Sequence, residues 1–307
     1  MFKPELFNSL KNYSTKTFVS DLIAGVIVGV VALPLAIAFA IASGVSPERG
    51  LFTAIIAGFC ISFFGGSKVQ IGGPTGAFAV IVYGVVNKFG YEGLVIATIM
   101  AGILLILLGA FKMGGLVKFI PYTIVTGFTA GIAVTILTGQ IGDFFGLTTG
   151  KMPGDFVGKI KVYIESFNTI NWYSFGIAAI SLIVIFLWPK INKKVPGSLI
   201  VIILATVVSL ILEHTLGWKT DTIGSRYGAI PSSLPAPTIP GINLELIKQL
   251  FPTAISIAVL AAIESLLSAV VADGMIGSKH DSNTELIAQG IANIASPIFG
   301  GIPATGA

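Results

Sequence analysis

The sequence predicts an all-α membrane protein that crosses the bilayer many times. Of its 307 residues, 54% are hydrophobic and only 10% are charged, and the mean hydropathy is +0.93. About 25% of the residues in a typical globular domain are charged. The charges here fall mostly between apolar runs, and most of these runs are long enough, as helices, to cross about 30 Å of hydrocarbon. The composition therefore indicates a multi-pass protein whose first partner is the lipid bilayer.

Nine apolar runs are candidate membrane spans. The first seven contain no Asp, Glu, Lys or Arg, and the eighth contains only Glu264. Two longer connections, residues 143–171 and the proline-rich residues 214–247, are predicted to be extracellular loops. The nine runs are residues 22–47, 50–67, 69–87, 93–111, 119–142, 166–189, 195–212 and 249–272 and the tract after Glu285.

We expect the chain to start in the cytoplasm and to lie in the inner (cell) membrane. Its first twenty residues are polar, and no cleavable signal precedes the first span. If the spans alternate, the inner side holds ten of the 18 basic residues, as the positive-inside rule requires. The basic residues form no cluster with aromatic residues, so nucleic acid is not an expected partner. The ten are Lys3, Lys11, Lys16, Lys68, Lys112, Lys118, Lys190, Lys193, Lys194 and Lys279.

Two similar glycine-proline stretches interrupt the apolar sequence. Residues 72–77 read Gly-Gly-Pro-Thr-Gly-Ala, and residues 300–307 read Gly-Gly-Ile-Pro-Ala-Thr-Gly-Ala. Seven runs precede the second long loop, so a repeat that starts at residue 248 enters the membrane from the opposite side. Interruptions at corresponding positions of inverted repeats indicate the substrate site of a transporter.

Each stretch is predicted to start a helix partway across the membrane. Because proline is tolerated at the first helical position, we expect half-helices to begin at Pro74 and Pro303 and to face each other near the midplane. A helix N-terminus carries partial positive charge and suits an anion, and Thr75 adds a hydroxyl group. The alternative is that these small residues serve helix packing alone. The first interpretation predicts an anion site without a buried Lys or Arg.

Glu264 is a second candidate functional residue. An ionised carboxylate in an otherwise uncharged membrane helix costs about 2.5–3.5 kcal/mol. At helical spacing, Ala261, Glu264, Ser268 and Val271 share one face. We expect Glu264 to take up a proton or to help bind a cation that compensates the anion. The alternative is a protonated carboxyl group that makes one structural hydrogen bond.

The motifs described above resemble those of the SulP anion transporters. The resemblance is most specific from Glu264 to Gly306, where the run 264–274 is followed by Gly290 with Asn293 and by Gly300–Gly306. Residues 72–77 are similar to the third span of that family. Leu33-Pro34 with Ala38-Phe39-Ala40 is similar to the first span, and could line a cavity wall.

The resemblance implies a fold of seven-plus-seven inverted repeats. It assigns residues 20–112 and 248–307 to a core domain and residues 118–213 to a gate domain, after a cytoplasmic N-terminus at residues 1–19. The chain would stop at the start of the tenth span, so the remaining spans and a cytoplasmic STAS domain would be missing. The full-length protein would be a homodimer.

The resemblance also implies a secondary active transporter of a small inorganic anion, sulfate or bicarbonate, that works by alternating access. Glu264 and Ser268 would couple transport to sodium ions or protons, and no cofactor or other metal is implied. The anion would lie between the third and tenth spans, at Phe39, Thr75, Gly76, Ala77, Ala304, Thr305 and Gly306.

Other functional classes fit the residues less well. A passive anion channel or exchanger could use the same site. A nucleobase permease of this architecture would need more polar side chains to bind the base edges. An enzyme is not expected, because both histidines, His214 and His280, fall in predicted loops and no His-Glu-x-x-His or Gly-x-Ser-x-Gly motif occurs.

Overall fold

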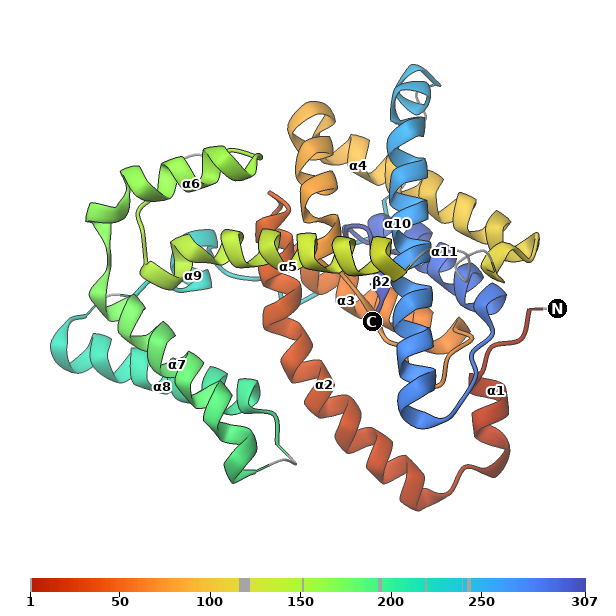
Figure 1. The fold of residues 1–307 in the computed structure, drawn as a ribbon, viewed down its shortest axis with the longest axis horizontal. Helices are drawn as coiled ribbons and strands as arrows, with labels where there is room; N and C mark the ends of the chain where they lie inside the picture. Colours follow the sequence, from red (N-terminus) through yellow and green to blue (C-terminus); the bar gives the residue numbers. More distant parts are fainter. Residues whose placement is uncertain are drawn as a thin grey trace. The chain divides into compact units, whose positions relative to one another are not determined.

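The computed structural model describes residues 2–115, 122–150, 152–192, 195–218, 220–238, 240–241 and 244–307. Three of the ten lysines predicted to lie on the inner side, Lys118, Lys193 and Lys194, fall outside these ranges. Within them, six helices are long and apolar enough to cross a membrane, which confirms the predicted all-α multi-pass class. They are α2 (Thr15–Ala42), α3 (Pro47–Phe64), α4 (Ala79–Ala110, with the turn before it), α7 (Trp172–Ile191), α8 (Gly197–Leu216) and α10 (Leu244–Ile276) (Figure 1).

The chain forms two compact units. The larger unit comprises residues 1–24, 32–128 and 230–307, and the smaller unit comprises residues 25–31 and 129–229. The assignment of core and gate roles to parts of the chain stays a prediction. The larger unit contains α3, α4, α10 and most of α2, and the smaller unit contains α7 and α8. The larger unit also holds α1 (Leu6–Ser9), η1 (Leu10–Asn12), β1 (Gly72–Gly73), η2 (Gly76–Phe78), α11 (Ser282–Ile298) and β2 (Thr305–Gly306).

In the smaller unit, two sequence-based expectations prove wrong. The connection at 143–171 is not simply a loop, because it contains α6 (Phe156–Glu165) and η4 (Phe167–Thr169). The Asp155 carboxylate accepts the Gly158 N–H at 2.7 Å and caps α6, as a short acidic side chain does at a helix start. His214 lies in the last turn of α8 rather than in a loop, because the helix continues to a left-handed Gly217. The unit also contains most of α5 (Tyr122–Phe145) and α9 (Ile223–Tyr227).

Helix α4 contains a break at Gly90. This residue has φ 70° and ψ −177°, a backbone conformation that glycine adopts at low cost. The sequence predicted separate spans at residues 69–87 and 93–111. Gly90 lies between these two predicted spans, and its non-helical backbone separates the two helical segments of α4, as the sequence predicted.

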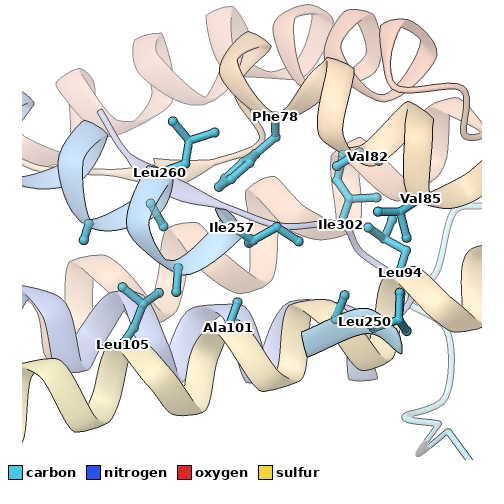
Figure 2. Close-up of a cluster of buried hydrophobic side chains, with 14 of the residues drawn as sticks. Phe78, Val82, Val85, Leu94, Ala101, Leu105, Leu250, Ile257, Leu260 and Ile302 are labelled. Atoms are coloured by element: carbon cyan, nitrogen blue, oxygen red, sulfur yellow. The ribbon is translucent and has the colours of Figure 1, made fainter. Parts of the chain in front are cut away.

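A hydrophobic core connects α4 with α10 in the larger unit. Figure 2 shows Phe78 and the α4 side chains lying against those of α10, with Ile302 from the segment after α11 among them. These residues fix the helices around the two glycine-proline stretches. The labelled members are Phe78, Val82, Val85, Leu94, Ala101, Leu105, Leu250, Ile257, Leu260 and Ile302.

Helices α4 and α11 approach each other closely at a pair of glycines. A methyl group added to Gly102 would lie 2.7 Å from the Gly290 carbonyl oxygen, and one added to Gly290 would lie 2.5 Å from the Gly102 carbonyl oxygen. Small residues allow such backbone contact between membrane helices, where packing is the main source of association energy.

We therefore predict that Gly290→Ala destabilises the full-length protein. Because the new methyl group would contact backbone atoms, the expected loss is about 1–3 kcal/mol, as for other overpacked sites. The measurement is the melting temperature of the detergent-solubilised protein. Gly84→Ala, in α4, is the control, since nothing lies within 4 Å of its added methyl group. Equal melting temperatures for the two variants would contradict the prediction.

Candidate functional site

The two glycine-proline stretches pair with each other as antiparallel strands. In β1 and β2, Gly72 lies opposite Gly306 and Gly73 lies opposite Thr305. Ile71 and Ala307 extend the pairing by exchanging two backbone hydrogen bonds of 3.1 and 2.8 Å. The structure thus brings together the two segments whose similarity the sequence analysis noted.

The pairing corrects the predicted half-helix starts. The first helical turn begins at Gly76, not at Pro74, and Thr75 before it is extended, with φ −129° and ψ 157°. The second stretch is a strand at Thr305–Gly306, so no helix begins at Pro303 within the chain. Strand hydrogen bonds hold Gly72–Gly73 and Thr305–Gly306 extended, and Thr75 is still extended between β1 and η2.

Side chains of neighbouring helices satisfy the backbone between α11 and β2. Asn293 accepts the Ala304 N–H at 3.0 Å and donates to the Ala304 carbonyl at 2.8 Å. The Ile302 N–H donates to Thr53 Oγ1 at 2.7 Å, and its carbonyl accepts from Ser296 Oγ at 2.8 Å. Because an unpaired backbone group in a membrane costs several kcal/mol, these side chains replace the bonds that a helix would provide.

Two further contacts hold the glycine turn that precedes this segment. Arg49 Nη1 donates to the Gly300 carbonyl at 3.1 Å, and the Tyr91 hydroxyl donates to the Gly301 carbonyl at 2.7 Å. The Arg49 guanidinium also lies 3.4 Å from the centre of the Tyr91 ring. A cation over an aromatic face is attracted by it, so the two side chains support each other.

Two serines of α10 hold β2. Ser265 Oγ accepts the Gly306 N–H at 3.0 Å, and Ser268 Oγ donates to the Gly306 carbonyl at 3.1 Å. Gln70 Nε2 reaches the same helix and donates to the Ser265 carbonyl at 2.8 Å and to Ser268 Oγ at 3.2 Å. Ser268 therefore lies at the candidate site with its hydroxyl group engaged, and its role in ion binding stays a prediction.

Glu264 lies where α10 meets both stretches. Its Oε2 atom accepts a hydrogen bond of 3.0 Å from Thr75 Oγ1. The Thr305 side chain adjoins the same carboxylate. Its buried Oγ1 atom makes no hydrogen bond of standard geometry with any described residue. The structure thus assembles one carboxylate and two hydroxyl groups.

The residues predicted to share one face of α10 differ in their exposure. Val271 is 63% exposed, whereas Ala261, Ser265 and Ala269 are fully buried. The buried side of α10 therefore carries Ser265 and the small residues Ala261 and Ala269. Their small side chains permit the close approach of β2.

The remaining predicted residues occupy different surroundings. Gly76 and Ala304 are buried, and Ala77 packs against the hydrophobic core. Phe39 lies on α2 and is half-buried. Their contact with an anion stays a prediction.

A stripe of buried polar residues on α11 escaped the sequence analysis as a group. Glu285, Gln289, Asn293 and Ser296 are all fully buried. The Glu285 carboxylate accepts from the Gly66 N–H at 2.9 Å and from Gln289 Nε2 at 2.8 Å. Their spacing of four, four and three residues in an apolar tract is a helical signal that could have revealed the stripe. Gln70 lies in a short connection and carries no such signal.

The connection between α10 and α11 contains a chain of hydrogen bonds that resembles a hydrolase triad. His280 Nδ1 lies 2.7 Å from Asp273 Oδ2, and His280 Nε2 lies 2.9 Å from Ser282 Oγ. The N–H groups of the two residues after Ser282 both donate to the Asp281 carboxylate, so they are not available to stabilise an oxyanion. The cluster ties this connection together and lacks that part of a hydrolytic site.

Comparison with known proteins now identifies the family. Residues 18–307 match the Sulfate permease family. The chain belongs to that family. It is 51% identical to YvdB of Bacillus subtilis over 297 residues, which cover 97% of this chain and 56% of YvdB. This sulfate permease family chain thus spans about half the length of the curated relatives that it matches.

Solved structures confirm the predicted fold of this sulfate permease family chain. The transmembrane domain of a cyanobacterium bicarbonate transporter, BicA, matches with a TM-score of 0.83 and 30% identity, over 96% of this chain and 76% of that one. The murine Slc26a9 anion transporter matches with a TM-score of 0.80 and 20% identity, over 99% of this chain and 54% of that one. Their fold is the seven-plus-seven inverted repeat. The family is one of transporters rather than enzymes.

We predict that Gly306→Ala disturbs the site by breaking the strand pairing. A methyl group at Gly306 would collide with the carboxamide nitrogens of Gln70 and Gln289, both of which are buried. Gly73→Ala, in the partner strand, is the matched control, because its added methyl group meets nothing within 4 Å. Calorimetric titration of the full-length protein with sulfate and with bicarbonate should show weaker binding for Gly306→Ala only. Equal affinities would contradict the prediction.

Proposed function

We propose that this protein carries a small inorganic anion, sulfate or bicarbonate, across the membrane by alternating access, coupled to sodium ions or protons. The observation that carries the proposal is the convergence of Thr75 and Thr305, from the two paired stretches, on Glu264. The matching family is named for sulfate, and its structurally similar relative BicA is a bicarbonate transporter, which supports this class of substrate.

The anion would bind where η2 and α4 begin. The first N–H groups of a helix have no partner within the helix, and the helix dipole adds partial positive charge there. Thr305 would donate a hydroxyl hydrogen bond, as would Thr75 once its hydroxyl turns from Glu264. Gly76, Ala77 and the segment Ala304–Gly306 would leave room for the anion beside the backbone. Phe39 would cover it from α2. Hydroxyl and N–H donors suit either oxyanion.

Glu264 would link anion binding to a cation. An ionised carboxylate next to an anion is unfavourable, because like charges a few ångströms apart in a poorly hydrated site repel strongly. A proton on Glu264, or a sodium ion held by Glu264 and Ser268, would remove that repulsion. By thermodynamic linkage, the cation would then raise the affinity for the anion as much as the anion raises that for the cation.

The proposed setting follows the family. The N-terminus would lie in the cytoplasm and the spans in the inner (cell) membrane. Residues 20–112 and 248–307 would act as the core that carries the anion past a gate at residues 118–213. The full-length protein would assemble as a homodimer.

The deciding experiment is uptake into proteoliposomes that contain the full-length protein. Radiolabelled sulfate and bicarbonate are offered separately, with imposed sodium or pH gradients and competing anions. Accumulation that depends on one of the cation gradients supports the proposal. Flux that follows the anion gradient alone would indicate a channel or exchanger, and absence of anion flux would reject anion transport.

We predict that Glu264→Gln abolishes cation-driven accumulation while the protein stays folded. The amide keeps the shape of the carboxyl group and can still hydrogen-bond to Thr75, but it can neither ionise nor neutralise a sodium ion. Glu92→Gln is the control, since Glu92 is an exposed residue of α4. Undiminished gradient-driven uptake by Glu264→Gln would remove the coupling role of this residue.

We also predict that Thr75→Val weakens anion binding. The change keeps the shape of the side chain and removes the hydroxyl group that reaches Glu264, for an expected loss of about 5- to 10-fold in affinity. Thr98→Val is the control, because the Thr98 hydroxyl is buried and bonds only within its own helix, to the Leu94 carbonyl. Titration of the purified full-length variants with sulfate and bicarbonate measures the effect. An affinity equal to that of the unmodified protein would place the anion elsewhere.

A further inference from the structure

Gln70 occupies a position next to the coupling residues that the proposed function does not explain. Its side chain is only 6% exposed, and it precedes the strand pairing that starts at Ile71. Its Nε2 atom donates to the Ser265 carbonyl and to Ser268 Oγ, one turn along α10 from Glu264. The uncharged amide group of Gln70 therefore donates hydrogen bonds to two oxygen atoms close in sequence to Glu264, the only carboxylate in this part of α10.

The orientation of this carboxamide is fixed by its partners. Turning the group over would place Gln70 Oε1 against the Ser265 carbonyl oxygen, and two acceptors repel each other. The observed orientation leaves Oε1 buried and without a hydrogen-bond partner among the residues that the structure describes. Because an unpaired buried acceptor is unfavourable, the side chain gains less from this position than a fully bonded one would.

The oxygen atoms that Gln70 occupies are of the kind that sodium ions use. In transporters with interrupted helices, carbonyl groups of the unwound backbone coordinate sodium. Here the Gly306 carbonyl belongs to such a segment and lies beside Ser268 Oγ, whereas the Ser265 carbonyl is part of the continuous α10. An N–H donor and a cation compete for the same lone pairs, and a hydroxyl oxygen has only two. Ser268 Oγ already accepts from Gln70 while it donates to the Gly306 carbonyl.

We propose that Gln70 competes with sodium for these α10 oxygens. Without sodium, its amide group occupies the Ser265 carbonyl and Ser268 Oγ; when sodium binds at Glu264 and Ser268, the amide leaves. This inference rests on the proposed coupling and names sodium as the cation.

This competition would couple cation binding to the geometry of the anion site. Gln70 is joined through Ile71 to the β1–β2 pairing, and this pairing brings Thr75 and Thr305 to Glu264. Release of Gln70 from α10 would therefore free the start of β1 as sodium binds. The occupancy of the cation site and the positions of the Thr75 and Thr305 hydroxyl groups would then change together.

The test compares Gln70→Met and Gln70→Asn with the unmodified full-length protein. Methionine fills the space without a donor, and asparagine keeps the amide but is one methylene shorter. Sodium is titrated against choline in two measurements, the melting temperature of the purified protein and the uptake of labelled anion. The sodium concentration for half-maximal effect should fall about 3- to 10-fold in both variants, as expected when one or two competing hydrogen bonds are lost. The KM for the anion at saturating sodium should stay unchanged.

Gln289→Met is the matched control. Gln289 is also fully buried and also adjoins Gly306, but its amide donates to Glu285 rather than to α10. Its half-saturating sodium concentration should equal that of the unmodified protein, so a shift confined to the Gln70 variants supports the proposal.

Other outcomes overturn the inference. An unchanged or raised half-saturating sodium concentration in the Gln70 variants would mean that Gln70 does not compete, and failure of both to fold would make it a scaffold residue. If the unmodified protein accumulates anion with protons alone, the inference fails while the proposed transport stands. If the unmodified protein moves no anion, transport fails, whereas the sodium titration of melting temperature still reports on Gln70.

Discussion

The central constraint on this structure is that two interrupted backbone segments must be hydrogen-bonded where little water is present. A continuous membrane helix satisfies its own N–H and C=O groups, but an extended segment cannot. Here β1 and β2 pair as antiparallel strands, and each satisfies some of the backbone N–H and C=O groups of the other. Other backbone N–H and C=O groups of residues 300–307 form hydrogen bonds with side chains on α3, α4, α10 and α11. These hydrogen bonds explain where polar side chains are buried in an otherwise apolar unit.

The same constraint explains the composition of the surrounding helices. Asn293 pairs with Ala304 as a neighbouring strand would, because its carboxamide offers one donor and one acceptor. Close approach to that backbone requires small residues, and a side chain at Gly306 would displace two buried glutamines. Gly72, Gly301 and Gly306 thus serve close packing. A role of these stretches in packing is therefore compatible with a role in a binding site.

The proposed transport chemistry uses what this scaffold places together. Glu264, Thr75 and Thr305 come from three elements, and the strand pairing brings two of them to the third. Ser265 and Ser268 hold β2 from the same face of α10 that presents the carboxylate. A change in the charge of Glu264 would therefore act on the helix that holds the strand. In the proposed mechanism, cation binding and anion binding would share one set of contacts.

The sequence by itself determined the membrane class and most of the spans, and it singled out the two glycine-proline stretches and Glu264, which the structure places together. These features are local, since apolar runs, helix-breaking residues and an isolated carboxylate can each be recognised from nearby residues. Only the tertiary structure decided that the stretches pair as strands, that helix formation starts at Gly76 rather than Pro74, and that Gln70 reaches α10. Those outcomes depend on hydrogen bonds between residues far apart in the chain. Local propensity favours a helix after Pro74, but helix formation begins only at Gly76, after Gly72 and Gly73 have paired with a segment from the other end of the chain.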